Sequence, residues 1–188
     1  MSNVAALYCP PTVWEPDPWY EPGDSTGDLH YDRNTPAVFQ AASWTCSCAS
    51  MAWVMNALGV GAPTPGLWDE WDAVNELRRI AGQGAVSPDY GLAYGSGIDL
   101  AAVYAEYGFT TERMVDVSWG QLAYLSENAI GQLGGARLYH WLGLRGYDGM
   151  TFNLANPAPG WKSVGQELTA GEWNTWGSWT AVMVTGVQ

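Results

Sequence analysis

The sequence predicts an α+β domain in which a helical N-terminal part packs on a C-terminal antiparallel β-sheet. Between residues 48 and 133 apolar side chains recur at helical spacings, whereas after Gly135 short apolar or alternating runs are separated by glycines. The chain has 188 residues, of which 47% are hydrophobic. This length and composition predict one domain with a substantial core.

The first 39 residues predict an extended arm. Six of the 11 prolines fall within the first 40 residues, and proline interrupts helices. The segment also carries Trp14, Trp19 and Tyr20, and exposed aromatic residues at this density are costly. We therefore expect an arm at 1–39 that lies against a domain at 40–188.

Four helices are expected in the first part of the domain. Residues 48–58 are apolar on nearly all sides, which predicts a buried helix, and Gly59 follows as its stop. Residues 67–81 have the spacing of an amphipathic surface helix, with acidic residues in the first turn and arginines in the last. Two further helices are expected at 97–107 and at 118–133, the second opened by Ser118 as N-cap.

The strands are expected after these helices. Three runs have the apolar or alternating character of antiparallel strands, namely ARLYHWLGLRGY at 136–147, MTFNLAN at 150–156 and WTAVMVTGV at 179–187. The order of helices first and strands second is typical of the α+β class.

Composition argues against several classes of function. The net charge of −12 repels phosphate backbones and anionic lipids, so we expect neither nucleic acid nor membrane as a partner. The sequence has no apolar run of about 20 residues and no export signal at its N-terminus. The 3 cysteines predict free thiols in a reducing environment. The cysteines and histidines lack the spacing of a zinc site, so no metal or other cofactor is expected.

Cys46 is the candidate nucleophile. It lies at the start of the expected buried helix, where free backbone amides favour a thiolate, and Ser43 and Thr45 beside it can cap the helix. Taken alone, a cysteine in this position also fits a small hydrophobic core residue. Cys48 is a competing nucleophile two residues further on.

His140 and Asn156 are candidates for the base and for the residue that orients it. His140 stands inside an apolar strand, where an imidazole needs a partner, and Asn156 ends the next strand before Pro157. A hairpin would bring the Asn156 amide beside the imidazole, which would leave the other ring nitrogen for the thiol.

Gln40 and two tryptophans complete the candidate site. Gln40 precedes Cys46 by six residues, so its amide and the Cys46 backbone N–H could together stabilise an oxyanion. Cys46 is preferred to Cys48 as nucleophile because it alone has this offset. Trp44 and Trp141 flank the catalytic candidates and are expected to wall the substrate site.

The motifs together resemble those of the papain-like cysteine peptidases, and specifically the bacteriocin-processing, or double-glycine leader, peptidases. The similar segments are QAASWTCSCAS from Gln40, HWLGLRGYDGMTFNLANP from His140, VSWGQLAYL and the terminal WTAVMVTG, so the resemblance covers about 38–187. The sequence departs from the family pattern in two places. Ser47-Cys48 replaces a pair such as Gly-Pro after the cysteine, and Asn156 replaces an aspartate.

The resemblance implies a papain-like fold and hydrolysis of an amide bond through a thioester acyl-enzyme. Similar peptidase domains occur in endolysins of bacteriophages that infect actinobacteria, where they cut peptidoglycan peptides. We therefore expect a phage endolysin peptidase, made in the host cytoplasm and acting at the bacterial cell wall. The alternatives are an inactive papain-like binding or virion structural protein, and a cysteine-dependent amidase or acyltransferase. The sequence does not indicate the oligomeric state.

Overall fold

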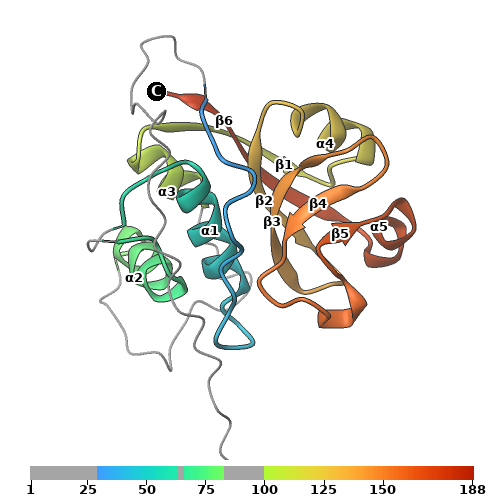
Figure 1. Ribbon diagram of the computed structural model, residues 1–188, viewed down its shortest axis with the longest axis horizontal. Coiled ribbons are helices and arrows are strands. Elements are labelled where there is room, and N and C mark those ends of the chain that lie inside the picture. The colour runs from blue at the N-terminus through green and yellow to red at the C-terminus, as the bar shows by residue number, and fades with distance from the viewer. Residues whose placement is uncertain (1–28, 63–65, 83–99) are drawn as a thin grey trace, which may run out of the picture.

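The computed structural model describes residues 29–62, 66–82 and 100–188 and confirms the α+β class. Three helices, α1, α2 and α3, gather on one side of the molecule, and the sheet with α4 and α5 forms the other side (Figure 1). The helices of the first side are α1 (Cys46–Ala57), α2 (Glu70–Ile80) and α3 (Leu100–Glu106). Those of the second side are α4 (Trp119–Leu125) and α5 (Ala170–Trp176), with a 3-10 turn at Trp161–Ser163.

The sheet has six antiparallel strands in the order β1-β6-β2-β3-β4-β5. Their bounds are β1 (Phe109–Val115), β2 (Ile130–Gly135), β3 (His140–Tyr147), β4 (Phe152–Ala155), β5 (Glu167–Leu168) and β6 (Trp179–Val187). The last strand therefore lies inside the sheet, between the first two. One hydrophobic cluster lies between the sheet and α1, α2 and α3, and a second covers the opposite face under α4 and α5.

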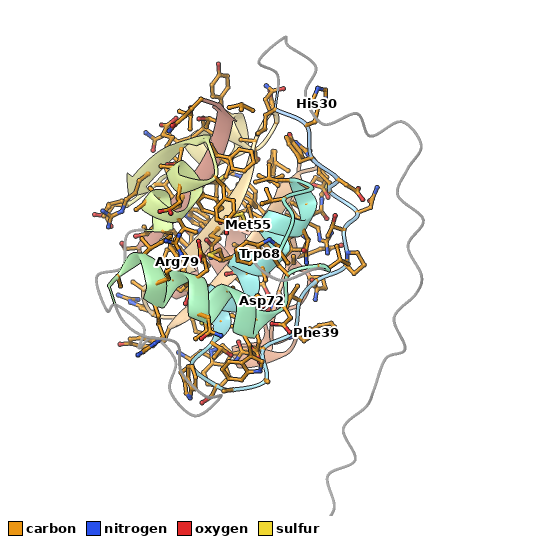
Figure 2. All side chains as sticks on the ribbon, turned by 90° about the vertical axis from the view of Figure 1, so that its left-hand side faces the viewer. His30, Phe39, Met55, Trp68, Asp72 and Arg79 are labelled. Carbon is orange, nitrogen blue, oxygen red and sulfur yellow. The ribbon has the colours of Figure 1, made fainter. Side chains whose placement is uncertain are left out.

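Helix α1 is apolar all round because it is enclosed. Met51, Trp53 and Met55 have no exposed surface, and the helix packs on both α2 and the sheet. Figure 2 shows Met55 and Trp68 in the interior of the helical side, whereas Phe39 lies at its edge. A Cβ on Gly143 of β3 would stand 2.4 Å from the Trp53 ring, so the glycine permits the close approach of α1 to the sheet.

The helix expected at 118–133 is wrong in its second half. Ser118 does open α4 with a capping box to Gln121, but the helix ends at Leu125, and Ile130–Gly135 forms strand β2. All six residues of β2 are buried because Ile130 contacts one hydrophobic cluster and Leu133 the other. A strand buried on both faces does not alternate, so its apolar residues resembled a continued helix.

The sheet also begins earlier in the chain than expected. Strand β1 at Phe109–Val115 pairs with β6 along the edge of the sheet, and its mixed exposure gives little apolar periodicity. The expected helices at 48–58 and 67–81 are present with slightly shifted ends. The first part of the helix expected at 97–107 lies outside the described residues.

The described part of the arm packs on the domain. Leu29, Tyr31 and Val38 contact the cluster between the sheet and the helices. The Trp53 indole donates a hydrogen bond to the Thr35 carbonyl at 3.0 Å. The expected contacts of Trp14, Trp19 and Tyr20 lie outside the described residues. Within the described part of the chain, helices are too short or too polar to cross a bilayer.

Candidate active site

Cys46 is the first residue of α1, and its sulfur lies against β3. The Trp141 backbone N–H donates to the Cys46 Sγ at 3.4 Å. This amide is available because β4 ends at Ala155, which pairs with Gly143, so no strand covers the edge of β3 at Trp141. The end of one strand thus opens a gap that the nucleophile candidate fills.

The surroundings of Cys46 have opposing effects on its thiol. Burial raises the pKa of Cys46 above its ordinary value of 9.0, while the backbone amides of Trp141, Ser47 and Cys46 lower it. Thr45 is the N-cap of α1, but its side chain makes no capping hydrogen bond. The amides of the first turn are therefore left to interact with the sulfur or with a bound substrate.

His140 begins β3 and Asn156 directly follows the neighbouring strand β4, which brings the two side chains together. The Asn156 side-chain NH2 donates to the carbonyls of Val164 at 3.0 Å and Gly165 at 2.9 Å, which fixes its orientation. The Asn156 Oδ1 therefore faces His140 Nε2 at 2.9 Å and must accept its hydrogen. This assignment places the proton on Nε2 and leaves Nδ1 as the basic nitrogen.

The imidazole is shielded from water. His140 is 2% exposed, and burial lowers its pKa below the ordinary value of 6.5, while the Asn156 hydrogen bond raises it. The Trp161 ring lies with its centroid 6.3 Å from that of His140 and keeps 41% of its surface exposed. Burial therefore favours a neutral imidazole beside a neutral thiol in the resting protein.

Gln40 lies on the loop that leads into α1. Its backbone N–H donates to the Pro157 carbonyl at 3.0 Å, which ties the loop to the residue after Asn156. Its side-chain Nε2 donates to the Ala42 carbonyl at 2.9 Å. The Gln40 Oε1 is buried and lacks a hydrogen-bond partner among the described residues.

The two tryptophans expected to wall the site lie on different elements. Trp44 precedes α1 and makes an edge contact with Trp71 of α2, with ring centroids 6.1 Å apart. Trp141 is half-buried on β3, and its ring passes over β2, where a Cβ on Gly134 would stand 3.0 Å from it. Trp141 contacts the Cys46 sulfur through its backbone amide, whereas Trp44 is two residues before Cys46 in the chain and packs on α2.

Cys48 lies in a different environment from Cys46. It has no exposed surface and belongs to the core cluster around α1. Burial raises the pKa of Cys48 to about 12, and the nearby Glu70 carboxylate contributes in the same direction. A thiol in this position remains protonated at neutral pH and packs as a small hydrophobic residue.

Sequence reasoning missed two residues at the site. Glu70 was interpreted as a favourable charge in the first turn of α2, but it is 4% exposed and binds the loop before Cys46. Trp161 follows Asn156 in the chain and reaches His140 through the 3-10 turn. The position of Glu70 on the buried side of its helix could have indicated its role. Nothing in the sequence indicated that Trp161 lies at the site.

A separate pocket of about 470 Å3 lies at the other end of β3. It is lined by Arg33, Asn34, Arg145, Gly146, Tyr147 and Asn153. Arg145 donates to the carbonyls of Leu154 at 3.0 Å and Thr35 at 2.7 Å, so it anchors the arm to the sheet. Because His140 begins β3 and Tyr147 ends it, this pocket does not contain the candidate catalytic residues.

Two solved structures share the fold over most of the chain. A double-glycine-motif protease from an AMS/PCAT transporter, in complex with the leader peptide, matches with a TM-score of 0.51 and 14% identity over 87% of this chain and 96% of that one. The peptidase domain of Streptococcus ComA, a bi-functional ABC transporter involved in a quorum-sensing pathway, matches with a TM-score of 0.50 and 15% identity over 80% and 98%.

No protein-family model and no curated protein matches the sequence. At 14–15% identity the two structural matches establish the fold. The chain therefore has the papain-like fold of double-glycine peptidases, as the sequence motifs predicted.

Proposed function

We propose that this protein is a cysteine peptidase with Cys46 as nucleophile, His140 as general base and Asn156 as the residue that orients the base. One observation carries the proposal. The Cys46 sulfur lies on the amide of the residue after His140, and Asn156 holds that histidine with Nδ1 as its basic nitrogen. The fold shared with double-glycine peptidases supports the same assignment.

The reaction follows from these positions. His140 Nδ1 takes the thiol proton as the Cys46 sulfur attacks the substrate carbonyl carbon, and the carbonyl oxygen becomes an oxyanion. The Cys46 amide and the Gln40 side chain stabilise this oxygen once Nε2 turns from Ala42 toward it. His140 then protonates the leaving amine, which leaves a thioester on Cys46. A water that gives its proton to His140 hydrolyses the thioester and restores the thiol.

For the substrate, we propose the stem or cross-link peptides of peptidoglycan, cut by a phage endolysin. The support is the resemblance of the motifs from Gln40 and His140 to double-glycine peptidases, because similar peptidase domains occur in actinobacteriophage endolysins. The complex of one structural neighbour with a leader peptide supports a peptide as ligand of this fold. In this role the enzyme is made in the host cytoplasm and acts at the cell wall.

Digestion of purified actinobacterial peptidoglycan tests both the proposed mechanism and the proposed substrate. The wild type should release new amino groups, Cys46→Ala should release none, and Cys48→Ala should retain the activity. A double-glycine leader peptide tested in parallel separates wall hydrolysis from leader processing. Amino-group release by Cys46→Ala at the wild-type rate contradicts the mechanism, and cleavage of the leader peptide alone contradicts the endolysin role.

An inactive binding or virion structural protein is the second candidate. Its support is the burial of Cys46 and His140, which disfavours the charged pair, together with the Ser47-Cys48 departure from the family pattern. Alkylation by iodoacetamide discriminates between the two candidates. An activated Cys46 reacts below pH 8 and slows in His140→Ala, whereas an inert thiol reacts slowly in both proteins. An amidase or acyltransferase would use the same residues and is distinguished by its products.

A further inference from the structure

Glu70 is a buried carboxylate that binds the loop between Gln40 and Cys46. Both of its oxygens accept the Ala41 backbone N–H at 2.8 Å. Its Oε2 also accepts the Thr45 hydroxyl at 2.7 Å. The carboxylate thus holds both ends of the segment 41–45, which joins the proposed oxyanion donor to the proposed nucleophile.

Neutral donors alone stabilise this carboxylate in the described part of the chain. The ion pairs found there join Arg79 to Glu76 and Glu106, and none involves Glu70. Burial raises the pKa of Glu70, while the hydrogen bonds from Thr45 and Ala41 lower it. Burying a carboxylate without a cation is costly, so a position this close to the nucleophile requires an explanation.

The Glu70 contact explains why Thr45 does not cap α1. A threonine at an N-cap normally accepts a hydrogen bond from an amide of the first turn. Here its hydroxyl is directed toward Glu70 and the Ala42 carbonyl, and the side-chain cap is absent. The first-turn amides therefore remain available at the Cys46 sulfur, where they lower the thiol pKa.

The same contact restrains the proposed oxyanion donors. Gln40 is tied to Pro157 by its backbone, and its side chain turns back to Ala42, next to the residue that Glu70 holds. The carboxylate also lies close enough to Cys48 to raise the pKa of that thiol. A negative charge beside a nucleophilic thiol does not favour a thiolate, so the contribution of Glu70 is geometric.

We propose that Glu70 is a positioning residue, whose carboxylate holds the loop 41–45 so that the Gln40 side chain can turn toward the point that the free amides of α1 face. This inference rests on the proposed peptidase function. Glu70 does not touch the substrate, and it acts through Ala41 and Thr45. This positioning role predicts that loss of the carboxylate lowers the rate of acylation more than it weakens substrate binding.

The test compares Glu70→Gln with Glu76→Gln. Glutamine at 70 keeps one acceptor oxygen and replaces the other by an NH2 group that opposes the Ala41 N–H. Glu76 is the matched control because it is on the same helix, is 5% exposed, and binds Arg79 away from the loop. Rates are divided by the amount of Cys46 that iodoacetamide titrates in monomeric protein with the circular dichroism spectrum of the wild type, so that misfolded protein is not counted.

Glu70→Gln should lower kcat per titrated site by about 10- to 100-fold, with KM changed by less than about threefold. Glu76→Gln should retain kcat within about twofold. Equal kcat values for Glu70→Gln and the wild type would overturn the proposal.

A second pair of variants keeps the inference testable if Glu70→Gln does not fold. Thr45→Val removes the hydroxyl that Glu70 accepts and should lower kcat per titrated site, and Thr45→Ser restores the hydroxyl and should recover it. If Thr45→Val matches the wild type, the positioning role is wrong. If the wild type cleaves no peptide or Cys46→Ala cleaves as fast, the proposed function fails instead, so the two failures are distinguishable.

Discussion

Cys46 and His140 reach the candidate site from two regions that are built differently. On the helical side, the buried Glu70 side chain binds both ends of the loop that leads to Cys46. On the sheet side, His140 begins β3 and Asn156 directly follows β4, and the backbones of these two strands pair over Phe152–Ala155. The position of the nucleophile therefore depends on a few side-chain contacts, whereas the position of the base depends on the register of a hairpin.

The largest expected effect on kcat/KM concerns the helical side and distinguishes the roles of its two cysteines. Cys46→Ala removes the nucleophile and should lower kcat/KM by at least about 1000-fold. Cys48→Ala removes only a buried core sulfur and should change kcat/KM by less than about threefold. Steady-state peptidase assays on both variants provide the measurement. Comparable losses in the two variants would contradict the assignment of Cys46 as the only nucleophile.

The next effect concerns the pH dependence of kcat/KM, which is set by His140 on the sheet side. Burial lowers the pKa of His140 below 6.5, and the base is neutral only above its pKa. The kcat/KM of the wild type should therefore fall as the pH drops through a midpoint below 6.5.

Asn156→Ala should lower kcat by about 10- to 100-fold, because His140 loses the partner that fixes its tautomer. It should also move the acid midpoint to lower pH, because the hydrogen bond that raises the pKa of His140 is lost. A pH series of kcat/KM measures both effects. Asn153→Ala on β4, the strand that precedes Asn156, is the control. An unchanged midpoint in Asn156→Ala would contradict the proposed contact.

A smaller effect is expected where the two sides meet. A Cβ at position 143 would stand 2.4 Å from the Trp53 ring of α1 and 3.0 Å from the Ala155 Cβ. Gly143→Ala should therefore lower the free energy of unfolding by about 1–3 kcal/mol through overpacking. It should also reduce kcat, since α1 carries Cys46. Denaturant unfolding measures the stability. An unfolding midpoint equal to that of the wild type would show that α1 and the sheet can move apart to accept the methyl group at no cost.

The smallest effect is expected far from the site on the sheet side. Ser118 caps α4 by accepting the Gln121 amide, and Gln121 returns a contact to the Ser118 amide. Ser118→Ala should lower the free energy of unfolding by about 1 kcal/mol. Its kcat should equal that of the wild type, because the His140–Asn156 pair depends on β3 and β4. A reduced kcat in folded Ser118→Ala would show that the His140–Asn156 pair also depends on α4.

The sequence alone determined the features that depend on neighbouring residues. The apolar run after Cys46, the N-cap at Ser118 and the runs around His140 and Asn156 predicted α1, the start of α4 and the β3–β4 hairpin. These features are local because helix capping and strand alternation are set within a few residues. The motifs that start at Gln40 and His140 were sufficient to predict the papain-like fold.

Only the tertiary structure decided the features that depend on contacts between distant segments. Strand β2 at Ile130–Gly135 exists because it is buried between β6 and β3, and its sequence alone read as helix. Glu70 has a buried position on its helix, but only the structure shows that the loop at Ala41 supplies the donors for its carboxylate. Burial and long-range hydrogen bonding are properties of the assembled chain, so no local pattern could identify these contacts.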